Sequence, residues 1–170
     1  MRFLSPDQCK AWVLTHHPRL NVPDDRGLEW PGAHCIRFTT PADAGKRVAL
    51  ARLLWHAMSH RSEAMLWVTE WGVWGSSEHM PLNVFLRKAF GENRTLKEAP
   101  GHLFVPDEAD AALSFLVVAI LFLWDAYLLS AGGELAIFIS HDEYCIVSSR
   151  DIGEGILLEK QLAAFIEPAT

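Results

Sequence analysis

The sequence predicts an α+β domain in which a mixed, mostly antiparallel sheet of about five strands packs against several helices. Half of the 170 residues are hydrophobic, so the chain can bury a sizeable core. Helix-start motifs alternate with short β-branched and aromatic runs. Residues 109–124 are predicted to form an almost wholly apolar helix. Because no repeat or long linker divides the chain, we expect one domain over residues 1–170.

The N-terminal elements are predicted from two helix-start motifs. Ser5–Gln8 combines an N-cap serine, a proline and a glutamine in capping-box spacing, which predicts a helix to about His16. The second motif, Thr40–Asp43, predicts a helix to about Arg61. His34–Thr39, between these helices, is a predicted strand.

The middle of the chain contains a predicted strand, a helix and a loop. The β-branched and aromatic run Met65–Val73 predicts a buried strand. Ser76 or Ser77 can cap a helix over about Glu78–Phe90. Residues 91–106 are predicted to be a loop because of their prolines and glycines.

The apolar helix over residues 109–124 has no face suited to water, so we expect it to be the most buried element. Three strands follow, over residues 125–130, 134–140 and 144–148, joined by turns into a meander. A last helix carries Leu158, Leu162 and Phe165 on one stripe. The predicted order is therefore α-β-α-β-α-α-β-β-β-α.

Charge is unevenly distributed along the chain, whose net charge is -6. Residues 107–170 contain 2 of the 15 Lys and Arg residues and 11 of the 21 Asp and Glu residues, which leaves 13 and 10 in residues 1–106. The net negative charge argues against nucleic-acid binding. The acidic C-terminal third predicts a basic protein partner, whereas ordinary solvation of dispersed carboxylates is the alternative.

The location that we expect is the cytoplasm. No apolar segment typical of a secretory signal follows the first residues, and Cys9, Cys35 and Cys145 show no spacing typical of disulfide frameworks or zinc ribbons. The longest apolar run is shorter than the roughly 18 residues that span a bilayer, so no membrane association is predicted.

His56 and His60 are candidate metal ligands because residues four positions apart on a helix can reach one metal ion. Ala57 follows the first histidine where a zincin metalloprotease has its glutamate, which excludes that class. A pair of surface histidines is the alternative.

The turn formed by His141, Asp142 and Glu143 is a candidate site. Together with Asp125, Glu70 and His102, it could form a metal or acid-base site. A polar hairpin turn is the alternative, because turns favour such residues.

Glu70 lies between Trp67 and Trp71 in a predicted strand, where a buried carboxylate would need a partner. Arg37 on the preceding strand is the candidate partner. Trp71 and Trp74 approach a glycine-containing loop, so they are candidates for lining a pocket or an interface.

We expect no cofactor. The glycines form neither the GxGxxG nor the GxxxxGK pattern of nucleotide-binding loops, and no GxSxG motif is present.

The sequence favours a non-enzymatic protein-interaction module that recognises a basic partner, with Trp71 or Trp74 as anchors. In its layout, a small α+β domain with an acidic surface, the chain resembles bacterial toxin-immunity proteins, which implies a basic toxin as partner. A small enzyme or ligand-binding protein, with a pocket of Glu70, His102 and His141, is the alternative. Self-association is a third hypothesis, because a second subunit would help to cover a helix that is apolar on all sides.

Overall fold

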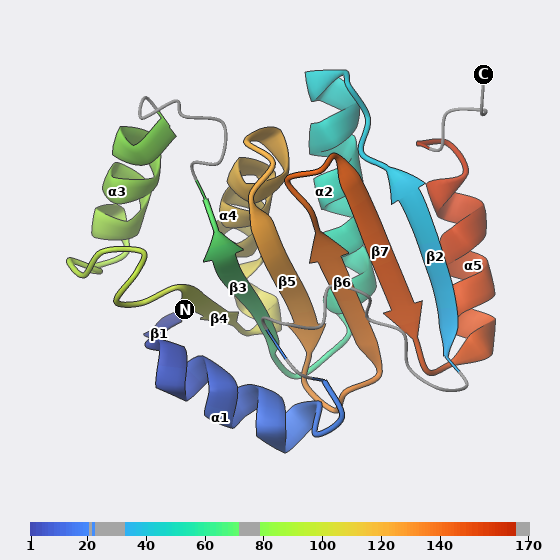
Figure 1. The fold of residues 1–170 in the computed structure, drawn as a ribbon, viewed down its shortest axis with the longest axis horizontal. Coiled ribbons are helices and arrows are strands. Elements are labelled where there is room, and N and C mark those ends of the chain that lie inside the picture. The colour runs from blue at the N-terminus through green and yellow to red at the C-terminus, as the bar shows by residue number, and fades with distance from the viewer. Residues whose placement is uncertain (21, 23–32, 72–78, 166–170) are drawn as a thin grey trace.

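A seven-stranded antiparallel sheet forms the centre of the molecule (Figure 1). The computed structural model describes residues 1–20, 22, 33–71 and 79–165. The strand order is β1-β4-β3-β5-β6-β7-β2, and every neighbouring pair is antiparallel. The strands are β1 (Arg2–Leu4), β2 (His34–Thr39), β3 (Ala64–Glu70), β4 (Gly101–Phe104), β5 (Asp125–Ser130), β6 (Leu135–Ile139) and β7 (Tyr144–Ser149).

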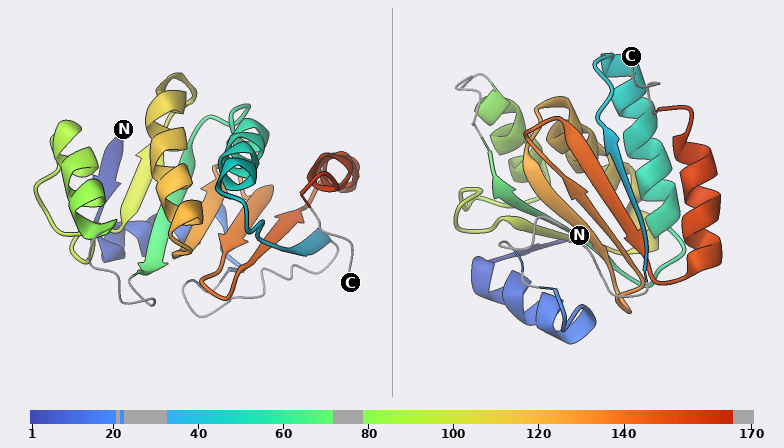
Figure 2. Two further views of the ribbon diagram at one scale, coloured as in Figure 1. Left: turned by 90° about the horizontal axis from the view of Figure 1, so that it is seen from above. Right: turned by 45° about the vertical axis from the view of Figure 1, so that its right-hand side comes forward.

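Five α-helices within the described residues cover the two faces of this sheet unequally. They are α1 (Pro6–His16), α2 (Ala44–Met58), α3 (His79–Ala89), α4 (Ala109–Leu121) and α5 (Ile152–Leu162). Four of them, α2 to α5, lie on one face, as the view along the sheet shows (Figure 2). The α1 helix packs on the opposite face.

Two hydrophobic cores result, one on each face, because successive strand residues point to opposite sides. On β3, Leu66 and Val68 belong to the larger core with α2, α4 and α5. Met65 and Trp67 belong to the smaller core, to which α1 contributes Cys9 and other residues. The central strands are therefore buried on both sides, which explains their nearly continuous apolar sequences.

The α+β class is confirmed, but the predicted count of about five strands and the predicted element order are wrong. The sheet is also wholly antiparallel, not mixed as predicted. The two extra strands are β1, of three residues, and β4, which lies inside the stretch predicted to be a loop. Such short segments carry too little periodicity to be found from sequence. Gly101, taken as a sign of a loop, is needed for close packing, because a Cβ atom there would lie 2.3 Å from Cys9 Sγ.

The helix boundaries differ from prediction at several ends. The α1 capping box of Ser5 and Gln8 is present as expected. Asp43, not Thr40, caps α2, which ends at Met58 rather than near Arg61. Part of the predicted strand Met65–Val73, together with Trp74, Ser76 and Ser77, lies outside the described residues.

The apolar helix α4 is shorter than predicted, and it is not the most buried element. It ends at Leu121, and the chain turns through Leu123, whose φ of 50° is left-handed. The Trp124 amide bonds to the Ala119 carbonyl, as in a Schellman cap. All residues of β5 and β6 are buried, whereas α4 keeps half-buried and exposed positions. No helix of the described ranges is long and apolar enough to cross a membrane.

Candidate functional site

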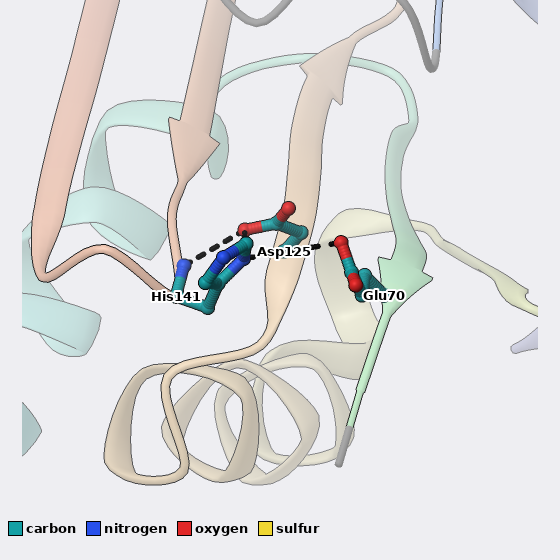
Figure 3. Close-up of side chains that lie close together, drawn as sticks. All are labelled: Glu70, Asp125 and His141. Atoms are coloured by element: carbon teal, nitrogen blue, oxygen red, sulfur yellow. Dashed lines mark hydrogen bonds and ion pairs between the residues drawn. The ribbon is translucent and has the colours of Figure 1, made fainter. Parts of the chain in front are cut away.

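Glu70, Asp125 and His141 lie together at one end of the sheet, and we call them the carboxylate/histidine cluster (Figure 3). Glu70 ends β3, Asp125 begins β5, and the two residues pair across these neighbouring strands. His141 follows the end of β6, the next strand in the sheet. Because neighbouring strands are antiparallel, the last residue of β3, the first residue of β5 and the residues after β6 all lie at the same end of the sheet. Residues distant in sequence therefore meet there.

Hydrogen bonds to Asp125 fix the geometry of the cluster. The Asp125 side chain is 3% exposed. Its Oδ1 accepts from the His141 backbone amide at 2.7 Å and lies 2.9 Å from His141 Nδ1. Glu70 Oε2 lies 3.9 Å from the same Nδ1, and the Glu70 side chain is 47% exposed. One ligand atom from each of the three residues lies within 4.8 Å of the others, and no other such group of three occurs in the described ranges.

The backbone around the cluster departs from regular geometry. Leu123 and Glu143, with φ of 50° and 62°, are the only non-glycine residues of the described chain with positive φ. Leu123 lies two residues before Asp125, and Glu143 lies two residues after His141. The β3–β5 register also shifts between Val68 and Glu70. Strained dihedrals and bulges tend to accumulate at functional sites, because they aim side chains that a regular strand would not.

The cluster can act chemically in two ways. Two carboxylates and an imidazole are a donor set that first-row divalent metal ions accept. Without a metal, the buried Asp125 orients the His141 ring through Nδ1, as carboxylates orient histidines in acid-base catalysis. Asp142 Oδ1 lies 3.4 Å from His141 Nε2 and is solvent-exposed, so the outer edge of the ring faces the surface.

His102, which the sequence grouped with Glu70 and His141, occupies a different environment. It lies on β4 opposite Leu66, four residues before Glu70 on β3, which is about 13 Å along the strand. Arg87 Nη1 donates to His102 Nε2 at 3.1 Å, so Nδ1 carries the proton and faces the Leu66 carbonyl at 3.3 Å. Burial, and then the charge of Arg87, lower the His102 pKa to about 3. His102 is therefore a neutral core residue, set apart from the cluster.

The pair of His56 and His60 remains on the surface. Their ring centroids are 5.3 Å apart, and both residues are exposed. His60 lies beyond the end of α2. No third histidine, cysteine or carboxylate completes a metal-ligand group with them among the residues that the structure describes.

The predicted pairing of Glu70 with Arg37 is wrong. Arg37 is on β2, at the sheet edge, and three strands separate β2 from β3. Its guanidinium stacks 4.0 Å from the centre of the Tyr144 ring. Glu143, the remaining candidate of the turn, lies 4.0 Å from Arg47. The residue that lies beside Glu70 is therefore His141, not the arginine that the sequence predicted.

Trp71 lines an open cavity of about 380 Å³ beside the cluster, together with Trp67. Thr69 also lines it and donates its hydroxyl to the Asp125 carbonyl at 3.2 Å. Lys10 from α1 and Lys97 contribute positive charge. Sequence reasoning missed both lysines, because nothing in their local sequence distinguishes them from other surface lysines.

Comparison with known proteins does not supply a function. No protein-family model matches the chain, and neither the curated proteins nor the solved structures give a significant match. The function is therefore inferred from the geometry of the cluster itself.

Proposed function

We propose that the protein binds a divalent first-row metal ion, such as Mn²⁺ or Zn²⁺, through Glu70, Asp125 and His141. The observation that carries this proposal is the convergence of the three ligand atoms within 4.8 Å, from the ends of three neighbouring strands. This proposal departs from the expectation that the chain uses no cofactor.

The measured spacings suit a shared ion after a small movement. Ligand atoms about 2.0–2.2 Å from one metal ion lie about 3–4 Å from each other. His141 Nδ1 lies 2.9 Å from Asp125 Oδ1 and 3.9 Å from Glu70 Oε2. Glu70, the most exposed of the three, has the freedom to close the remaining gap. Three protein ligands leave coordination positions open for water or a bound molecule.

The proposed site also explains why a carboxylate is buried there. Asp125 is held by the His141 amide and ring, and its burial would be unfavourable without such partners. A metal ion bound at His141 Nδ1 would require the ring proton to reside on Nε2, because an imidazole coordinates through an unprotonated nitrogen. Protons compete with the ion for the histidine and the carboxylates, so metal binding should weaken as the pH falls.

The test is calorimetric titration of chelator-treated protein with Mn²⁺ and with Zn²⁺. We expect one ion per chain, with affinity reduced at least ten-fold in Glu70→Gln and in Asp125→Asn. Glu70→Gln is the safer variant because its side chain is half exposed, so it should fold normally. Co²⁺ absorption spectra would report the coordination geometry directly.

His56→Gln is the matched control, because it removes a histidine from the other candidate pair. Unchanged affinity in this variant places the ion at the carboxylate/histidine cluster. Loss of binding in His56→Gln, or full binding in both Glu70→Gln and Asp125→Asn, would contradict the proposal.

A protein-interaction function is the second candidate, and exposed apolar side chains on α5 support it. Ile152, Ile156 and Leu157 are 57%, 42% and 58% exposed, and acidic Glu159 lies on the same helix. The charge asymmetry adds less support, because Arg61 pairs with two carboxylates of the acidic third. Light scattering at high concentration tests whether a second copy of the chain is the partner. A dimer that Ile156→Glu abolishes would support self-association through α5, and a strict monomer would exclude self-association.

A further inference from the structure

A second polar cavity lies between α3 and the segment that follows it, apart from the carboxylate/histidine cluster. Its volume is about 230 Å³. Asn83, Val84, Arg87 and Lys88 line it from α3, and residues 92–96 complete the wall. Drug-sized ligands occupy roughly 300–1,000 Å³, so this cavity suits a smaller molecule.

Asn83 is the unusual residue of this cavity. Its side chain is 1% exposed, yet its amide nitrogen and oxygen both lack a hydrogen-bond partner in the described parts of the chain. A buried amide without partners costs about 1–3 kcal/mol, so such groups are rare in folded proteins. Both atoms are fully buried, so a molecule in the cavity would reach this donor group and this acceptor after the Asn83 side chain moves toward it.

The charge of the cavity is positive. Among the lining residues, Arg87, Lys88 and Arg94 outnumber a single carboxylate, Glu92, which Arg94 holds through both oxygens. A second carboxylate, Glu98, lies outside the lining and is bonded to Thr95. The neighbouring His102 is neutral, as described above. The cavity therefore favours an anion.

Arg87 provides a buried charge without a direct ion pair. It is 2% exposed, and no carboxylate in the described ranges lies within 4 Å of its nitrogens. Its guanidinium donates instead to the carbonyls of Ala99, Arg94 and Thr95. These bonds hold the cavity wall in place, and Glu92, the nearest carboxylate of the lining, offsets only part of the positive charge of Arg87 and its neighbours.

We propose that this cavity binds a small organic anion that carries both a carboxylate and a hydroxyl group. The carboxylate would lie near Lys88 and Arg94, in the field of Arg87. The hydroxyl would donate to Asn83 Oδ1, and the Asn83 amide would donate to an oxygen of the ligand. The two hydrogen-bonding groups of Asn83 then gain the partners that the chain itself does not supply.

Calorimetric titration with L-malate and with succinate tests this inference, since the two dicarboxylates differ by one hydroxyl group. We expect L-malate to bind at least ten-fold more tightly than succinate. In Asn83→Leu, which keeps the side-chain volume, this difference should disappear. Lys88→Gln should weaken both ligands equally, because Lys88 is exposed and contributes only charge.

Lys160→Gln is the matched control, because Lys160 is exposed on α5, which lies on the same face of the sheet as α3 but at the opposite edge, beside β2. It should bind both ligands as the original chain does. Asp125→Asn should also leave L-malate affinity unchanged, which separates this inference from the proposed metal site.

Three outcomes would overturn the inference. The first is no binding of either dicarboxylate at 10 mM. The second is tighter binding of inorganic phosphate than of L-malate, which would show a site for inorganic anions. The third is unchanged L-malate affinity in Asn83→Leu, which would show Asn83 to be a hydrated structural amide.

Discussion

His141 and His102 lie in the same sheet and differ in the charges that face them. His141 is 15% exposed and stands between the carboxylates of Glu70 and Asp125. His102 is buried among Phe3, Phe104 and Phe115, with the Arg87 guanidinium against its Nε2. The first histidine is held between two carboxylates, close to the surface. The second is fixed in one neutral tautomer.

The difference shows that the residue facing an imidazole, more than its position in a sheet, decides what that imidazole can do. A carboxylate partner makes the ring a donor through one nitrogen and leaves its other nitrogen available to a further partner. An arginine partner requires an acceptor nitrogen, so protonation of the ring would break the contact. Each half of this contrast can be tested separately.

The largest expected effect is loss of stability in acid. Burial lowers the pKa of His102 to about 3 and that of His17 to about 4, while both titrate near 6.5 in the unfolded chain. As the pH falls below 6.5, the unfolded state takes up protons that the folded state excludes. The free energy of unfolding should therefore fall by on the order of 3–5 kcal/mol between pH 7.5 and 4.5.

Urea denaturation at a series of pH values measures this dependence. His102→Gln, which cannot titrate, should show a shallower decrease than the original chain, whatever its stability at neutral pH. A free energy of unfolding that stays constant down to pH 4.5 would mean that both histidines are protonated in the folded protein.

Removing Arg87 should have the next largest effect. Arg87→Leu leaves the carbonyls of Ala99, Arg94 and Thr95 without their donor, and His102 without its partner. We expect a loss of about 3 kcal/mol in the free energy of unfolding. Lys88→Leu, one residue along on the exposed side of α3, is the control and should change stability by less than about 0.5 kcal/mol. If the two substitutions changed the free energy of unfolding equally, Arg87 would have no structural role.

Asp125→Asn should have a moderate effect on stability, measured without metal. It weakens the charge-assisted hydrogen bonds from the His141 amide and ring, which predicts a loss of about 1–2 kcal/mol. Glu70→Gln should stay within about 0.5 kcal/mol, because its side chain is half exposed. A larger loss in Glu70→Gln than in Asp125→Asn would show that Glu70 holds the cluster together.

The smallest expected effect is a gain in stability from Glu143→Gly. The left-handed φ of 62° disfavours any residue with a Cβ atom by about 1 kcal/mol, and glycine adopts it freely. The Glu143–Arg47 contact of 4.0 Å is exposed on the glutamate side and contributes little. Thermal unfolding should show a rise in Tm for Glu143→Gly and none for Glu143→Ala, which removes the same contact but keeps the strained φ.

Local sequence determined which elements could be predicted. The capping box of Ser5 and Gln8 satisfies backbone groups of its own helix, so the local sequence suffices to predict where that helix begins. The strands of the meander are rich in β-branched and apolar residues, which suffices to predict them. The strands β1 and β4 form only because distant segments pack on them, as Gly101 does against Cys9. No window of sequence contains both partners of that contact.

The candidate site was predictable in part for the same reason. Strand ends mark where polar residues can meet, which is why Glu70, Asp125 and His141 could be grouped from their positions. The inclusion of His102 and the pairing of Glu70 with Arg37 required the strand order, which the sequence does not show. Arg87 and Asn83 were missed because a buried polar residue on a helix looks, in sequence, like any exposed one.

The strand order has a consequence for how the chain is made. Phe3 of β1 pairs with His102, and Ile36 of β2 pairs with Val147, so both edges of the sheet are formed by segments synthesised early. Each must wait for a partner about 100 residues later, whereas β5, β6 and β7 are joined by short turns. During synthesis, the first strands are therefore exposed without a neighbour. A truncated chain that stops before β7 should accordingly aggregate, although most of its sequence is already present.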